Sequence, residues 1–348
     1  MKWVNIPAKA FNPAAEQQAL VHQGMLTKPP GSLGQLEQIA THLAGLQGVI
    51  KPALDNVMIR VFAADHGVVD EGVSAFPQVV TGEMVKNFAA QGAAITVMAE
   101  SLDANFGVIN LGTLNELPEL PSVQNDRIAA GTYNFCQQAA MTEAQLSVAL
   151  SAGQAVAIDA IEHKAQLFIG GEMGIGNTSS ATAIACALLN RNALQLTGAG
   201  TGLDSQGIDK KAQIIQQALD THQGQLDSPL RILQFVGGFE IASLTGAYLH
   251  CAQVGIPVLI DGFISSVAAL VAQRINPDSR SWFLFSHRSA ELGHQQILAA
   301  LEAETILDIG MRLGEASGAA VVLPLIRLSC SLHNNMATFS DAAVSTQS

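Results

Sequence analysis

Short apolar runs that stop at Gly, Asp or Ser and lead into a helical stretch recur from about residue 55 onward, and this alternation constrains the fold most. Runs this short and this apolar are typical of parallel strands that are covered on both faces. The sequence therefore predicts an α/β fold, with a mostly parallel Rossmann-like sheet flanked by helices. The predicted strands are 57–63, 167–169, 232–236, 258–260, 282–285 and 306–309.

Apolar residues at helical spacing fill the segments between these runs. Thr142-Glu-Ala-Gln145 has the form of a capping box, in which the side chains at each end bond the other residue's amide. A long apolar stripe follows it, so a long helix is expected to begin there. The other predicted helices are 32–46, 82–90, 179–189, 209–219, 241–253, 265–273 and 316–329.

Residues 1–50 show helical patterns without strands. We expect them to join the C-terminal helices in a smaller helical lobe beside an α/β catalytic domain at 51–330. Residues 340–348 are predicted to form a loose tail.

The charge balance limits the possible partners. Lys and Arg number 17 against 29 Asp and Glu, a net charge of −12. Such a chain repels phosphate backbones and anionic lipid, so no nucleic acid and no membrane is expected as a partner. No secretory signal is visible, the apolar runs are too short to span a bilayer, and the scattered cysteines form no C-x-x-C pair. We predict a cytoplasmic protein with free thiols and small-molecule substrates.

The segment Gly170-Gly-Glu-Met-Gly-Ile-Gly-Asn-Thr-Ser-Ser180 follows a predicted strand and opens a helix. Free N–H groups and the helix dipole bind phosphate in such a place. Asn177 stands where a P-loop has its lysine, so the loop suits one terminal phosphate better than a triphosphate. The alternative is a tight turn whose glycines serve packing. The phosphate candidates here are Gly174, Gly176, Asn177, Thr178 and Ser179.

A second glycine cluster, 197–204, precedes Lys210 and Lys211. Either lysine could neutralise a substrate phosphate. Each could equally belong to a solvated helix start.

Glu315 stands among glycines and apolar residues before a predicted helix. An apolar setting would raise its pKa and suit it to general-base chemistry, although a glutamate at this position is also an ordinary helix starter. His66, His287 and His294 suggest a metal site only weakly, because metal ligands come in tighter sets. We expect these histidines to hydrogen-bond loops around the cleft.

Taken together, segments in order along nearly the whole chain resemble the nicotinate-nucleotide–dimethylbenzimidazole phosphoribosyltransferase family. These segments are 28–34 (KPPGSLG), 64–67 (ADHG), 72–77 (GVSAFP), 171–180, 197–204, 236–240 (VGGFE), 261–263 (DGF), 286–294 and 312–315 (RLGE). The resemblance implies a homodimer without metal or organic cofactor. Its substrates would be nicotinate mononucleotide and dimethylbenzimidazole, joined to make the lower-ligand nucleotide of cobalamin.

The resemblance also implies roles for single residues. Glu315 would be the general base and Glu172 would assist it. Lys211, in preference to Lys210, would hold the nucleotide phosphate with the 174–179 loop, Gly202 and Ser289. The candidates for the base pocket are Ser74, Gln78, Met84 and Leu313.

Two departures from the family pattern are visible. The family commonly has Gly after the catalytic Glu, where this chain has Ala316, and its G-T-A-N-F segment reads GTYNF at 131–135. Both leave the fine substrate preference open. Two rival hypotheses remain: a non-catalytic nucleotide-binding protein that uses the same loop, and a metal-dependent hydrolase built on the histidines.

Overall fold

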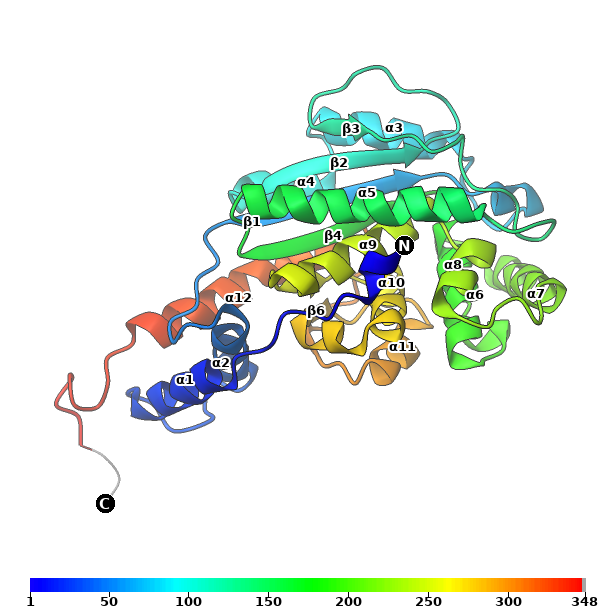
Figure 1. The fold of residues 1–348 in the computed structure, drawn as a ribbon. Helices are drawn as coiled ribbons and strands as arrows, with labels where there is room; N and C mark the ends of the chain where they lie inside the picture. The colour runs from blue at the N-terminus through cyan, green and yellow to red at the C-terminus, as the bar shows by residue number, and fades with distance from the viewer. Residues whose placement is uncertain (346–348) are drawn as a thin grey trace.

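The computed structural model describes residues 1–345 and contains one seven-stranded sheet in which every strand pair is parallel. The strand order is β3-β2-β1-β4-β5-β6-β7 (Figure 1). This confirms the predicted α/β class and parallel sheet. The strands are β1 (Val57–Ala64), β2 (Asn105–Gly112), β3 (Val123–Asn125), β4 (Leu167–Met173), β5 (Val258–Ile260), β6 (Phe283–His287) and β7 (Thr305–Leu307).

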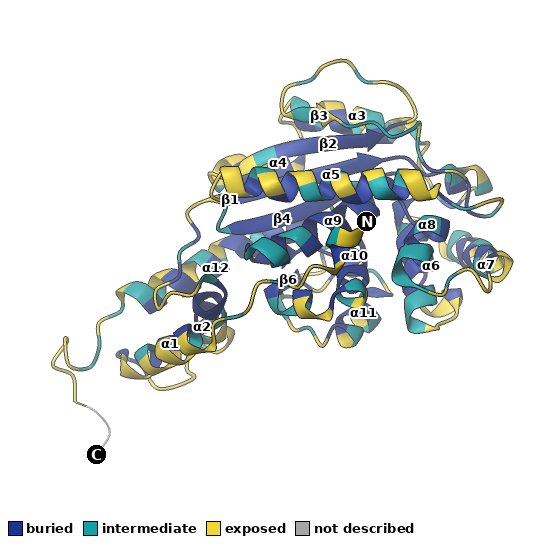
Figure 2. Cartoon of the chain, in the orientation of Figure 1, coloured by how far each residue is buried: buried dark blue, intermediate teal, exposed yellow. Residues whose placement is uncertain are grey.

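Helices cover both faces of the sheet. In Figure 1, α5 (Glu143–Glu162) and α9 (Phe239–Val254) lie in front of the central strands, and α4 (Ala94–Ser101) and α12 (Ser317–Asn335) lie behind them. Figure 2 shows the central strands as buried, which explains why their sequences are almost continuously apolar. The other helices are α1 (Pro13–Met25), α2 (Gln35–Gln47), α3 (Val79–Ala89), α6 (Asn177–Leu189), α7 (Ser205–Thr221), α8 (Pro229–Val236), α10 (Phe263–Ile275) and α11 (His294–Ala300). Short 3-10 turns are η1 (Lys2–Asn5), η2 (Gly67–Glu71), η3 (Ala193–Gln195) and η4 (Pro277–Trp282).

The strand order reverses between β1 and β4. After β1 the chain continues to β2 on one side, and after β4 it continues to β5 on the other. The loops that leave two such strands turn away from each other and open a crevice, where α/β proteins bind ligands. The segments after β1 and β4 are the ADHG and GIGNT motifs.

Two parts of the strand prediction were wrong. Residues 232–236 belong to helix α8, which begins at Pro229 after Ser228. A short apolar run does not distinguish a strand from a buried helix, and proline in the first helical turn was the signal that decides. Strands β2 and β3 were not predicted, because β2 begins with exposed Asn105, and β3 is a short edge strand with exposed Gln124 and Asn125.

The predicted capping box at the start of α5 is present, since the Thr142 hydroxyl accepts from the Gln145 amide and the Gln145 side chain accepts from the Thr142 amide. By length and apolar composition alone, α5 is the one helix of residues 1–345 that could cross a membrane. However, it packs along α9, and Leu146 and Leu150 are buried in that contact. We therefore interpret α5 as a core helix.

Helices α1 and α2 pack on each other and on the end of α12, away from the sheet (Figure 1). Because α12 continues through residue 330, one helix joins the sheet to this lobe. The division at residues 50 and 330 stays a prediction. In the predicted tail, Val344 donates to the Phe339 carbonyl in a turn, and residues 346–348 lie outside the described part.

Candidate active site

A cavity of about 710 Å³ opens at the carboxyl ends of the central strands. Its lining combines apolar side chains, carboxylates and the glycine loop after β4. The residues that line it are Phe76, Val80, Met84, Glu172, Met173, Gly174, Ile175, Asn177, Thr178, Gly200, Thr201, Asp261, Gly262, Phe263, Ile264, Ser265, His287, Ser289, Glu291, Arg312, Leu313, Gly314 and Glu315.

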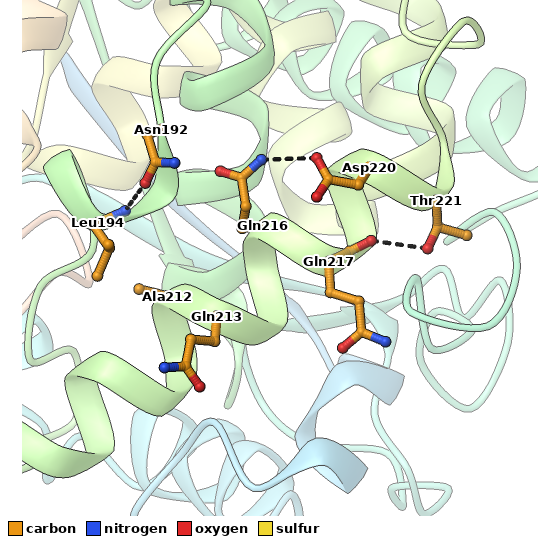
Figure 3. A pocket seen from close by; sticks show the side chains of 8 residues that line it. All are labelled: Asn192, Leu194, Ala212, Gln213, Gln216, Gln217, Asp220 and Thr221. Atoms are coloured by element: carbon orange, nitrogen blue, oxygen red, sulfur yellow. Dashed lines mark hydrogen bonds between the residues drawn. The ribbon is translucent and has the colours of Figure 1, made fainter.

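A second hollow lies on the outer surface between α7 and η3 (Figure 3). Its only ionisable lining residue is Asp220, which already accepts a hydrogen bond from Gln216. Glutamine side chains make up much of its lining. This hollow offers no group suited to acid–base or phosphate chemistry.

The glycine loop brings three of its predicted residues to the cavity: Gly174, Asn177 and Thr178. Gly176 does not line the cavity but shapes the turn, with a φ of 96° and no room for a Cβ beside Val69. Ser179 is fully buried in the first turn of α6.

Lys211 lies behind this loop on α7. Its side chain is 1% exposed, and its ammonium donates to the Thr178 hydroxyl over 2.8 Å. Burial lowers the pKa of Lys211 to about 8, although the nearby Glu291 carboxylate opposes the shift. The ammonium of Lys210 instead lies toward Gly72. Of the two lysines, the fold brings Lys211 to the loop.

The two other predicted phosphate residues differ in placement. Ser289 lines the cavity, and its hydroxyl accepts from the Glu291 amide. Gly202 has a φ of 109° and does not line the cavity, although Gly200 and Thr201 of the same segment do.

Glu315 is 6% exposed at the cavity edge, and its Oε2 has no hydrogen-bond partner among the described residues. Burial, and then the negative charge of Asp261, raises the pKa of Glu315 to about 7. The carboxylate can therefore accept and release a proton near neutral pH. Its backbone has a φ of 60°, a left-handed conformation that is unfavourable for a non-glycine residue.

Glu172, at the end of β4, accepts a hydrogen bond from the Asn177 side chain. Burial raises its pKa well above the ordinary value, and the charges of Glu240, Asp261 and Glu315 raise it further. Burial and the neighbouring negative charges thus both favour the protonated form of Glu172. Both carboxyl groups have raised pKa values, as is common where carboxyl groups act in proton transfer.

The predicted base pocket is present in part. Met84 and Leu313 line the cavity, together with Phe76 and Val80, which the sequence did not single out. Ser74 does not line it; its hydroxyl lies 3.3 Å from that of Thr201. Gln78 also does not, because its side-chain amide donates to the His66 carbonyl over 2.6 Å.

Three charged residues of the cavity, Asp261, Glu291 and Arg312, lie in segments that the sequence analysis singled out, but they were given no role there. Asp261 follows β5 and accepts from the Ala319 amide at the start of α12. Its position directly after an apolar run was the available signal. Arg312 reaches the Gly200 carbonyl over 3.3 Å, and Glu291 lies opposite Lys211.

The three histidines are engaged by protein groups. His66 pairs with Glu240 at 2.7 Å, with both side chains fully buried. His287 bonds Ser286, and His294 bonds Ser266 and the Ser289 amide. Within residues 1–345 no group of three His, Cys, Asp or Glu side chains is arranged to hold a metal ion.

Known proteins resemble this chain along nearly its whole length. A family model described as phosphoribosyltransferase matches residues 8–344. The nicotinate-nucleotide–dimethylbenzimidazole phosphoribosyltransferases of Pseudomonas putida and Pseudomonas fluorescens are each 56% identical over 342 residues, which cover 98% of this chain and 97% of each relative. The crystal structure of CobT from Thermus thermophilus superposes with a TM-score of 0.92 at 41% identity, over 96% of this chain and 100% of that chain. The chain belongs to the nicotinate-nucleotide–dimethylbenzimidazole phosphoribosyltransferase family.

Proposed function

We propose that the protein transfers the 5-phosphoribosyl group of nicotinate mononucleotide to 5,6-dimethylbenzimidazole, giving alpha-ribazole 5′-phosphate and nicotinate for the nucleotide loop of cobalamin. One observation carries this proposal. A single cavity combines a phosphate-binding loop backed by Lys211, an apolar wall, and the carboxylate of Glu315, whose pKa lies near 7.

The donor requires binding more than activation. Its pyridinium ring is already a cation attached to C1′, so breaking the C1′–N bond releases nicotinate without a proton donor. In this proposal the 174–178 loop, with Lys211 behind it, holds the phosphate and thereby fixes the ribose in the cavity. Ser289 adds a hydroxyl there.

The acceptor requires a flat apolar site and a base. Phe76, Val80, Met84 and Leu313 supply the apolar wall. As one ring nitrogen of the benzimidazole forms the bond to C1′, Glu315 removes the proton from the other, which prevents a cationic product. Attack from the face opposite nicotinate converts the β-nucleotide into an α-riboside.

Glu172 has a supporting role in this proposal. Burial and neighbouring negative charges raise its pKa, and its protonated form adds no negative charge beside Glu315. The Asn177 side chain holds Glu172 against the phosphate loop. The transfer needs no reactant beyond the two substrates.

The decisive experiment mixes purified protein with nicotinate mononucleotide and dimethylbenzimidazole and identifies the products. We expect nicotinate to appear only when the benzimidazole is present. Nicotinate release without an acceptor would indicate a hydrolase, and binding without any release would indicate a nucleotide-binding protein.

We also propose that the protein is a cytoplasmic homodimer. The projecting helix α1 exposes Leu20, Val21 and Met25, an apolar surface that a second copy could cover. The four cysteines are free thiols, as a reducing compartment allows. Light scattering on the purified protein tests the dimer, and cell fractionation tests the location.

A further inference from the structure

The hydroxyl of Thr81 connects two parts of the cavity that the chain places far apart. It donates to Oδ1 of Asp65 over 2.6 Å and accepts from the Ile175 amide over 3.0 Å. The Thr81 side chain is fully buried in α3. Both of its hydrogen bonds are therefore shielded from water.

The direction of these two bonds is fixed by Asp65, which directly follows β1 and is fully buried. Its Oδ2 accepts from the Leu114 amide over 2.7 Å, so both carboxylate oxygens receive hydrogen bonds. Since the neighbouring His66 pairs with Glu240, Thr81 is the side-chain donor to Asp65. With its proton directed at Asp65, the Thr81 oxygen is left to accept from Ile175.

Each side of Thr81 belongs to a different substrate site. On α3, Val80 precedes Thr81 and Met84 lies one turn later, and both line the apolar wall. Ile175 lies between the glycines of the phosphate loop and also lines the cavity. Among the described residues, the Thr81–Ile175 bond is the one hydrogen bond that joins α3 to the 174–180 loop.

We propose that Thr81 is a positioning residue, which fixes the helix that carries the acceptor wall to the loop that binds the donor phosphate. This inference rests on the proposed function. In-line transfer requires the acceptor nitrogen to meet C1′ within a few tenths of an ångström, and misplacement by about 1 Å can lower a rate about 10²-fold. The Asp65 carboxylate, directly after β1, thus anchors Thr81, and through Thr81 it anchors both α3 and the phosphate loop.

The test compares two substitutions of Thr81. Thr81→Val keeps the shape but removes the donor and the acceptor, whereas Thr81→Ser keeps the hydroxyl. At saturating substrates we expect kcat of Thr81→Val to fall about 10²-fold, while the Kd of each substrate measured alone stays within about threefold. Thr81→Ser should recover most of kcat.

Thr245→Val is the matched control. Thr245 is also fully buried, but its hydroxyl donates to the Ile241 carbonyl of its own helix, α9, over 2.9 Å and lies 3.4 Å from the Ala268 carbonyl of α10. It bonds neither α3 nor the 174–180 loop. Loss of this hydroxyl should lower the melting temperature and leave kcat unchanged. If Thr81→Val loses kcat and Thr245→Val keeps it, the loss is due to misplaced substrate sites rather than to lower stability of the protein.

Three outcomes would overturn the proposal. The first is a Thr81→Val enzyme with wild-type kcat, and the second is weaker binding of one substrate with kcat unchanged. The third is a Thr81→Ser enzyme that does not recover the rate. If Thr81→Val does not fold, Thr81→Ala replaces it, because alanine also lacks the hydroxyl and adds no apolar group beside the Asp65 carboxylate. Equal kcat values for Thr81→Ala and Thr81→Ser would then overturn the proposal. Failure of the proposed function is distinct, since the wild type would itself release no nicotinate with the acceptor present.

Discussion

The backbone of Ala316 lies so close to Gly171 that a Cβ on Gly171 would stand 2.6 Å from the Ala316 nitrogen. Gly171 precedes Glu172 on β4, and Ala316 follows Glu315 at the start of α12. This contact therefore packs the loop that carries Glu315 against the strand that carries Glu172. The placement of the two glutamates relative to each other depends on Gly171, where a side chain does not fit.

Gly171→Ala should consequently disable the enzyme. The new Cβ meets backbone atoms, which cannot swing away, so the 314–316 loop must shift. A shift of about 1 Å at Glu315 should lower kcat about 10²-fold. Gly24→Ala in α1 is the control, because its Cβ would meet nothing within 4 Å. A steady-state assay showing normal kcat for Gly171→Ala would mean that the loop tolerates the displacement.

Ala316→Gly should stabilise the protein. Ala316 has a φ of 67°, and a left-handed conformation costs a residue with a Cβ about 1–2 kcal/mol, which glycine avoids. We expect a higher melting temperature in calorimetry and kcat close to wild type. A lower melting temperature would show that the Ala316 methyl group, which is fully buried, contributes more packing than strain.

Glu315→Gln tests the general base. The variant should bind both substrates, while kcat falls roughly 10²–10⁴-fold because the amide cannot take a proton. The wild type should lose activity as pH falls through about 7, where Glu315 becomes protonated, and the variant should lack this limb. Glu172→Gln should lose less and keep the limb. The reverse pattern would exchange the roles of the two glutamates.

The same substitution should change stability in the opposite sense. The pKa of Glu315 is raised on folding from 4.5 to about 7, so the native state binds the extra proton between these values and the free energy of unfolding falls as pH rises through them. Above pH 7 the wild type carries the whole cost, at most about 3 kcal/mol, and Glu315→Gln does not. Denaturant unfolding at pH 8 should show a more stable variant, with the difference shrinking toward pH 4.5.

Lys211→Met tests the phosphate site. Loss of one charge-assisted contact should weaken nicotinate mononucleotide binding by about 1.5–3 kcal/mol and leave the affinity for the free base nearly unchanged. Because the ammonium loses its proton as pH rises through about 8, kcat/KM for the nucleotide should decline on that side in the wild type but not in the variant. Lys210→Met is the control, and a defect confined to that control would reassign the phosphate role.

The sequence was most informative where local chemistry carried the signal. The apolar runs predicted β1, β4, β5, β6 and β7 because strands buried on both faces leave little room for polar residues. The capping box predicted the start of α5 for the same local reason. The glycine loop and Glu315 were found from composition and spacing, with the resemblance adding their roles.

The features that the sequence did not predict depend on contacts between segments that are distant along the chain. Helix α8 looked like a strand because its short apolar run fits either structure. Pro229 was the local signal for a helix, and the run packs against α6 and α10. Gln78 looked like a base ligand until the fold placed the His66 carbonyl 2.6 Å from its amide. The effect of the Asp261 charge on the pKa of Glu315 could not be predicted, since the two residues lie on different segments that only the fold brings together.

The sequence by itself determined the α/β class, the parallel strands buried on both faces and the start of α5, because hydrophobic periodicity and capping are local properties. The tertiary structure decided that the Lys211 ammonium meets Thr178 of the loop, and that the pKa of Glu315 rises to about 7. It also decided that Thr81 bonds both Asp65 and Ile175. The physical reason is that a pKa depends on burial and on the distance to other charges, and a hydrogen bond depends on the distance between donor and acceptor. Burial and these distances are properties of the packed chain.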